Sequence, residues 1–210
     1  MSLAPRRPRI ALAGAALFVA TAALVAAGAF TRLDQYAVSH LMPWLQPEPH
    51  ALVTISSLTL PGLEGSPGRK LVDLWTYPAA FVPSALLVLV SAWRMRVRGR
   101  VDAAVTSCAL WVAGNAVELA GKLGVERPAL YRDGVHVTGF DQSLPSGHTI
   151  RSLVVAGALA WAWRRGRLAF AWAAGVPFAL VALGHHTPTD VVAGVFVAVA
   201  LAGWAPGRRG

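Results

Sequence analysis

The chain has 210 residues, of which 55% are hydrophobic and only 14% are charged, and its formal net charge is +9. This composition excludes an intrinsically disordered chain and argues against a soluble globular protein. The basic residues form no stripe with interleaved aromatic side chains, so no nucleic-acid partner is expected.

The first predicted element is an apolar stretch over Ile10–Phe30. It is long enough to cross a bilayer, which takes about 20 residues. The preceding R-R-P-R and the A-G-A near its end are also typical of a secretory signal peptide with a cleavage site. Because the apolar core of a signal peptide has only about 7–15 residues, we interpret this stretch as a retained membrane helix.

The following segment, residues 31–70, is too polar and too rich in proline to cross a membrane. Its stretch Y-A-V-S-H-L-M-P-W-L is amphipathic, which is typical of segments that lie on a membrane surface. We therefore expect an interfacial lid or collar on the outer side. The prolines that divide it into short pieces are Pro43, Pro47, Pro49, Pro61 and Pro67.

Further apolar stretches complete a set of six predicted spans. The predicted fold class is therefore all-α, a six-transmembrane-helix bundle formed by a single domain over residues 1–210. Alanine- and glycine-rich spans allow close packing within one chain or between copies, so the oligomeric state stays open. The later spans are Leu71–Trp93, Val101–Gly121, His148–Trp163, Leu168–Gly184 and Asp190–Trp204.

Arginine clusters orient the predicted bundle. They lie at residues 6–9, 94–100, 164–167 and 208–209 and contain 12 of the 17 arginines. Six spans place all four clusters on the same side, which the positive-inside rule assigns to the cytoplasm. We therefore expect a multi-pass protein of the cell (plasma or inner) membrane with both termini in the cytoplasm.

Ionisable residues gather at the opposite, outer ends of the predicted spans. Charged groups at membrane depth are costly, so they indicate a functional site. An active site that faces the outside is therefore expected. The residues concerned are Lys122, Arg127, His148, Arg151, His185, His186 and Asp190.

The S-G-H turn at residues 146–148 has the features of an anion cradle. Gly147 lets the backbone approach an anion closely, and a helix that begins there directs free N–H groups at it. Lys122 and Arg127 supply positive charge, and the planar arginine fork fits phosphate oxygens. These residues predict a site for a phosphate or an oxyanion.

The stretch H-H-T-P-T-D places His186 and Asp190 four residues apart. On a helix this spacing brings both side chains to one face. A carboxylate there can hold one imidazole nitrogen and leave the other free as a base or nucleophile.

The stretches G-K-L-G-V-E-R-P, L-P-S-G-H-T and G-H-H-T-P-T-D-V-V-A-G resemble, in this order, the three signature motifs of the type 2 phosphatidic-acid phosphatase (lipid phosphate phosphatase) superfamily, as found in membrane-bound bacterial-type members. The resemblance implies metal-independent, cofactor-free hydrolysis of a lipid or polyprenyl phosphate or diphosphate through a phosphohistidine. Membrane lipids would then surround the site and its substrate. A lipid phosphotransferase and a non-catalytic lipid-binding or transport relative are the alternatives.

The resemblance also implies roles for single residues. His186 corresponds to the nucleophile, Asp190 to the group that orients it, and His148 to the general acid and base. No metal ligand is implied. The groups that correspond to phosphate ligands are Lys122, Arg127, Ser146 and Gly147.

The sequence departs from the family pattern in two motifs. In the first motif six residues usually separate lysine from Arg-Pro, whereas four separate Lys122 from Arg127. Ala129–Leu130 stands where many relatives have a second Arg-Pro pair. In the third motif, Ala179–Leu180 stands where Ser-Arg is usual. The resemblance therefore implies a site that lacks a phosphate-binding arginine.

Arg151 is the predicted replacement for that arginine. It follows His148 by three residues, so on a helix both side chains share a face and reach the same cavity. The alternative is that Arg151 extends to the lipid headgroups, since it lies within one turn of the helix end. Arg132, in the preceding polar loop, is a second candidate for the missing phosphate ligand.

Overall fold

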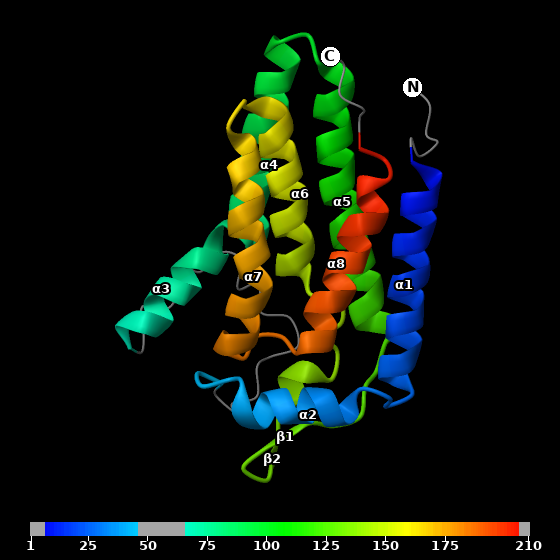
Figure 1. The fold of residues 1–210 in the computed structure, drawn as a ribbon, viewed down its shortest axis with the longest axis vertical. Coiled ribbons are helices and arrows are strands. Elements are labelled where there is room, and N and C mark those ends of the chain that lie inside the picture. Colours follow the sequence, from blue (N-terminus) through cyan, green and yellow to red (C-terminus); the bar gives the residue numbers. More distant parts are fainter. Residues whose placement is uncertain (1–6, 46–65, 206–210) are drawn as a thin grey trace.

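The computed structural model describes residues 7–45 and 66–205. This part of the chain is all-helical apart from one small hairpin, which confirms the predicted fold class at that level. Helices α1, α4, α5, α6, α7 and α8 run lengthwise beside one another, α2 lies across one end, and α3 projects sideways (Figure 1). The elements are α1 (Pro8–Ala26), α2 (Thr31–His40), α3 (Pro67–Thr76), η1 (Tyr77–Ala79), α4 (Phe81–Val97), α5 (Val101–Gly124), β1 (Tyr131–Arg132), β2 (Val135–His136), η2 (Thr138–Phe140), α6 (Gly147–Ala162), η3 (Gly166–Leu168), α7 (Ala169–Leu183) and α8 (Pro188–Ala202).

Three helices in the described residues are long and apolar enough to cross a membrane. They are Pro8–Ala26, Val101–Gly124 and Gly166–Leu183, and a bent pair formed by α3 with η1 and α4 brings the number to four. Helix α8 is apolar but shorter, with 15 residues. These helices are consistent with a membrane protein, whereas the full set of six spans stays a prediction.

The span predicted over residues 71–93 is not one straight helix. Its two halves, α3 and α4, meet at an angle of 49°. Between them, η1 contains Pro78, and Ala80 has an extended backbone with φ −62° and ψ 160°. Because proline lacks an N–H group, Pro78 cannot donate to the preceding helical turn, and the helix breaks at this point.

Helix α6 is the central element of the bundle and contacts α4, α5, α7 and α8. Its small side chains Ala156, Ala158 and Ala162 are buried almost completely, which lets the neighbouring backbones come close. Large apolar side chains instead cover the outside, such as Trp93 on α4 and Phe178 on α7, which are 67% and 79% exposed. This inverted pattern fits helices that are surrounded by lipid.

The predicted interfacial segment 31–70 contains helix α2 and the first residues of α3, and its residues 46–65 lie outside the described residues. In α2, the buried side chains Ala37 and Val38 pack against Leu130, Val137 and Phe140 of the loop between α5 and α6. Helix α2 thus covers the end of the bundle from which α6 starts (Figure 1).

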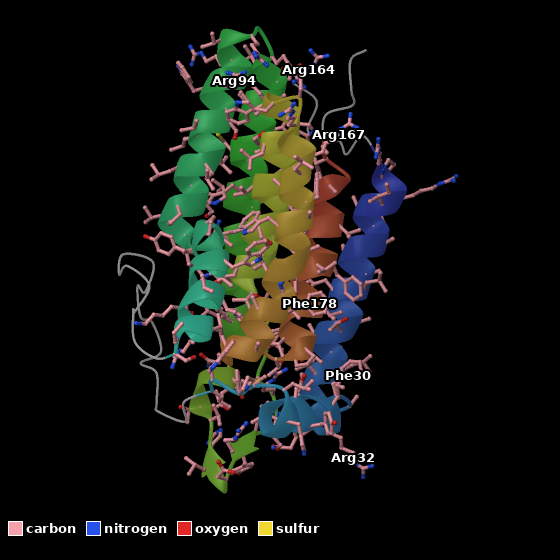
Figure 2. All side chains as sticks on the ribbon, turned by 60° about the vertical axis from the view of Figure 1, so that its left-hand side comes forward. Phe30, Arg32, Arg94, Arg164, Arg167 and Phe178 are labelled. Carbon is pink, nitrogen blue, oxygen red and sulfur yellow. The ribbon has the colours of Figure 1, made fainter. Side chains whose placement is uncertain are left out.

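Arginine side chains close the opposite end of the bundle. Arg94 of α4 and Arg98, which directly follows α4, donate to the carbonyl of Ala162 at 3.1 and 3.2 Å. Such bonds satisfy the last carbonyls of a helix. Figure 2 shows Arg94, Arg164 and Arg167 at this end and Arg32 of α2 at the other end. The arginine clusters at residues 94–100 and 164–167, which were predicted to lie on the same side of the membrane, therefore lie at the same end of the fold (Figure 2).

Candidate active site

The turn between α7 and α8 fixes the carboxylate of Asp190. Thr187 and Asp190 form a capping box, in which the Asp190 backbone N–H donates to Thr187 Oγ1 and Thr187 N donates to Asp190 Oδ2 at 2.9 Å. Ser143 Oγ donates to the same Oδ2 at 2.7 Å. One donor comes from the turn before α8 and the other from the loop before α6. Together they hold the carboxylate in one orientation.

His186 lies directly beside this carboxylate. Its Nδ1 is 3.5 Å from Asp190 Oδ2, and the His186 side chain is only 10% exposed. Within the described residues this buried Nδ1 has no hydrogen-bond partner. A small shift of the ring would let Nδ1–H donate a hydrogen bond to Asp190 Oδ2. Catalytic hydrogen bonds commonly shorten in this way when substrate binds.

The N-terminus of α6 is built against the same turn. Ser146 caps the helix by accepting from Thr149 N at 3.4 Å, and its own N–H donates to the carbonyl of Asp190 at 3.0 Å. A Cβ on Gly194 would lie 2.8 Å from the carbonyl oxygen of Ser146, so glycine allows α8 to pack this closely. Two of the predicted motifs thus meet through their backbones, although they are far apart in the sequence.

The Ser146 side chain is fully buried and serves as the helix cap. Its hydroxyl also accepts from Thr149 Oγ1 at 3.1 Å. The first N–H groups of a helix have no partner within it and favour negative charge. The start of α6 at Gly147 and His148 therefore offers backbone donors, and a direct phosphate contact of the Ser146 hydroxyl stays a prediction.

Lys122 and Arg151 meet on the two sides of one carboxylate, that of Glu118. Lys122 Nζ lies 2.8 Å from Glu118 Oε1, and Arg151 Nη1 lies 2.5 Å from Oε2. Arg151 Nη1 also donates to Asn115 Oδ1 at 2.9 Å, and its Nε donates to the carbonyl of Ala79 at 2.8 Å. Both cations thus lie together near the start of α6.

The Arg151 side chain is directed into the bundle, because only 7% of it is exposed. This placement differs from the alternative in which it extends to the lipid headgroups. His148 interacts electrostatically with Arg151, His186 and Lys122, so the predicted acid, the predicted nucleophile and two cations belong to one cluster.

The chain also carries a family signature that agrees with this geometry. Residues 105–207 match the sequence model of the PAP2 superfamily. The chain belongs to the PAP2 superfamily. Comparisons with curated proteins and with solved structures gave no match.

Membership of the PAP2 superfamily confirms the predicted resemblance and indicates phosphatase or phosphoryl-transfer chemistry on phosphate esters. The matched segment extends from the first half of α5 to beyond α8 and includes all the predicted site residues. Helices α1 to α4 lie outside it. Their contribution to the site has to be deduced from the structure.

Arg127 is placed differently from the other predicted phosphate ligands of this PAP2 chain. Its Nη2 donates to Asp34 Oδ2 at 3.0 Å and to Thr189 Oγ1 at 2.6 Å, and its Nη1 donates to Thr187 Oγ1 at 2.9 Å. Nη1 also lies 3.4 Å from Asp190 Oδ1. With 4% of its side chain exposed, Arg127 binds carboxylates and hydroxyls, and the structure does not bring it to Lys122 and Arg151.

Asp34 is a buried carboxylate that the sequence analysis did not single out. It accepts from Thr189 Oγ1 at 2.6 Å as well as from Arg127. Burial raises the pKa of Asp34 above its ordinary value, while the Arg127 guanidinium and the Thr189 hydroxyl oppose this rise. One guanidinium therefore serves two carboxylates, those of Asp34 and Asp190.

Arg132, the second candidate for the missing arginine, is directed away from the histidines. Its Nη1 donates to the carbonyls of Val38 and Met42, near the C-terminal end of α2. Cations at this position satisfy the last carbonyls of a helix. Arg132 thus fastens α2 to the hairpin of β1 and β2.

Sequence signals existed for some of the residues that were missed. The T-x-x-D pattern at Thr187 and Asp190 is a capping box, which a search for helix starts would have found. Asp34 gave no such signal, because a single acid on an amphipathic helix is usually exposed to solvent. Glu118 precedes Lys122 by four residues, a spacing that indicates an ion pair on one helix face. The described residues contain no group of three His, Cys, Asp or Glu side chains that could hold a metal ion.

Proposed function

We propose that this PAP2 protein is an integral membrane phosphatase that hydrolyses a lipid or polyprenyl phosphate or diphosphate through a phosphohistidine on His186. The observation that carries the proposal is the position of His186 Nδ1, 3.5 Å from a carboxylate oxygen of Asp190. With Nδ1 directed at Asp190, Nε2 is the nitrogen free to attack. The fixed carboxylate stabilises the ring as it loses electron density.

In the first step, His186 Nε2 forms a bond to phosphorus while the bond from phosphorus to the ester oxygen breaks. His148 donates a proton to the departing oxygen. In the second step, His148 accepts a proton from water, whose oxygen attacks phosphorus and breaks the P–N bond. Inorganic phosphate leaves, and both histidines return to their starting states.

The cations near the start of α6 stabilise the phosphoryl group during both steps. Lys122, Arg151 and the backbone N–H of Gly147 bind its oxygens, because charge redistributes over them in the transition state. Arg127 acts on the reaction through Asp190, which it holds from the side opposite His186. This assignment makes Arg127 a positioning residue.

The same proposal includes six spans, both termini in the cytoplasm, and a site at the outer leaflet. It is supported by the arrangement in which Arg94, Arg164 and Arg167 lie at one end and α2 covers the other (Figure 2). Positive residues are retained on the cytoplasmic side. A substrate with a long apolar tail then reaches the site from the outer leaflet, between the helices.

An assay of free phosphate tests the proposed activity. Purified protein in detergent is incubated with a set of lipid monophosphates and polyprenyl diphosphates, and phosphate release is measured with and without an added lipid alcohol. Release from at least one of them supports a hydrolase, and a product phosphorylated on the added alcohol identifies a phosphotransferase. If the protein binds the lipids without any turnover, the non-catalytic alternative replaces the proposal.

A further inference from the structure

The carboxylate of Glu118 occupies the place where the site has most positive charge. Its two oxygens contact Lys122 Nζ at 2.8 Å and Arg151 Nη1 at 2.5 Å, and 13% of the Glu118 side chain is exposed. The same carboxylate lies against the helix start, because a Cβ on Gly147 would be only 2.0 Å from its oxygens. Glu118 also interacts electrostatically with His186.

An anion bound between two cations over a glycine is the arrangement expected for a bound phosphate. Here the anion belongs to the chain itself. A phosphoryl group must either displace the carboxylate from Lys122 and Arg151 or share these cations with it. Arg151 keeps its place in both cases, since Ala79 and Asn115 also bind its guanidinium.

We propose that Glu118 is a specificity-determining residue, an internal counter-ion that competes with the phosphoryl group for Lys122 and Arg151 and disfavours highly charged phosphates. This inference rests on the proposed function, because it takes the Lys122–Arg151 cluster as the phosphate site. With Glu118 ionised, these three side chains sum to a single positive charge. Glu118 thus lowers the net charge of this cluster from +2 to +1, which weakens the binding of a dianion more than that of a monoanion.

Two anions that differ in charge can separate the electrostatic effect of Glu118 from a change in the shape of the site. At pH 8 inorganic phosphate is mainly a dianion, because its second ionisation is largely complete at that pH, whereas dimethyl phosphate is a monoanion. Electrostatic energy is proportional to the product of the charges. Removing the Glu118 charge should therefore strengthen binding of the dianion about twice as much, on a logarithmic scale, as binding of the monoanion.

The test is calorimetric titration of the purified full chain in detergent with each anion. The variant is Glu118→Gln, which keeps the size of the side chain and an oxygen that can accept from Arg151. The matched control is Glu126→Gln, which removes an exposed carboxylate from the loop that follows α5. We expect Glu118→Gln to bind inorganic phosphate at least about tenfold more tightly, with a smaller gain for dimethyl phosphate and no change in the control.

Three results would overturn the inference: unchanged or weaker phosphate binding by Glu118→Gln, equal gains for the two anions, or the same gain in Glu126→Gln. If Glu118→Gln does not fold, Glu118→Ala replaces it. This variant also removes the negative charge, so tighter phosphate binding is again expected, and its absence counts against the inference.

Turnover is measured separately on the wild type with the lipid phosphates. Phosphate binding that follows the expected pattern without any turnover would refute the proposed hydrolase and leave the role of Glu118 intact. Turnover with no gain in the Glu118 variants would refute the counter-ion and leave the hydrolase intact.

Discussion

Arg127 Nη2 donates to Asp34 Oδ2 at 3.0 Å, and this bond joins the loop after α5 to helix α2. The other side of the guanidinium lies 3.4 Å from Asp190 Oδ1. Helix α2 lies outside the segment that matches the PAP2 superfamily, yet through Arg127 it is bound to the carboxylate beside His186. The covering helix and the candidate site thus form one unit.

The charge of Asp34 predicts how stability depends on pH. Because burial raises its pKa in the folded protein, the folded state takes up a proton at a higher pH than the unfolded state. Stability from this group is therefore fully present below the ordinary pKa of 3.8 and is lost as the pH rises through the raised value. The change is at most about 1.4 kcal/mol per pH unit.

The comparison is between the wild type and Asp34→Asn, which does not titrate. As the pH is lowered from 7.5 in thermal unfolding experiments, we expect the wild type to gain stability relative to the variant. A difference that is constant from about pH 4 to pH 7.5, a range that lies above the ordinary carboxyl pKa, would show that Asp34 titrates normally in the fold.

Arg151→Ala should lower kcat/KM about ten- to a hundredfold, because a charge-assisted bond to phosphate contributes roughly 1.5–3 kcal/mol. Arg151→Lys should recover part of this loss, since an ammonium keeps the charge without the planar fork. Activity on the best lipid phosphate is the measurement, and near-normal activity of Arg151→Ala would remove Arg151 from the phosphate site.

Leu180→Arg should partly rescue Arg151→Ala. Leu180 is fully buried and packs with Ala79, whose carbonyl accepts from Arg151 in the wild type. The side chain of an arginine at position 180 would therefore start close to the space that the Arg151 side chain occupies in the wild type. The double variant should be more active than Arg151→Ala alone, and a double variant that folds but has no more activity would argue against this replacement.

The close contact between α1 and α8 depends on the absence of a side chain at Gly14. A Cβ at this position would lie 2.4 Å from the backbone nitrogen of Ala200, so Gly14→Ala must push the helices apart, at a cost of about 1–3 kcal/mol. Gly157→Ala on α6 is the matched control, because no atom lies within 4 Å of its added Cβ. Thermal unfolding should show a lower Tm for the first variant and an unchanged or higher Tm for the second.

Thiol labelling in intact cells tests the topology. In a Cys108→Ser background, Val135→Cys in the hairpin should react with an impermeant reagent, whereas Arg165→Cys near the arginine clusters should not. The four clusters support this orientation through the positive-inside rule. Labelling of Arg165→Cys alone would place the site on the cytoplasmic side.

Apolar length and charge predicted most of the bundle. The helices found as α1 and α5 to α8 lie where the apolar stretches indicated, because lipid-facing helices need continuous apolar surface. The break between α3 and α4 was not predicted, although Pro78 stands at it, since the surrounding residues are apolar enough to suggest one span. Hydropathy alone does not show whether an apolar stretch forms one straight helix or a bent pair.

The motif residues of the candidate site could be located from spacing, but their partners could not. The spacing of His186 and Asp190 puts them on one face whatever the rest of the fold does. One partner of Arg127, Asp34, lies on α2, 93 residues earlier in the chain. Contacts of that kind depend on tertiary packing, so they cannot be predicted from the residues of a short motif.

Covalent capture of phosphate on His186 tests the central claim most directly. Purified protein is mixed with a lipid phosphate carrying a radiolabelled phosphoryl group, quenched in alkali, where phosphohistidine is stable, and analysed for labelled peptide in the wild type, His186→Ala and His185→Ala. We predict label on His186 in the wild type, loss of label and turnover in His186→Ala, and only a mild effect in His185→Ala. Equal losses in the two variants, or label on a different side chain, would contradict the mechanism.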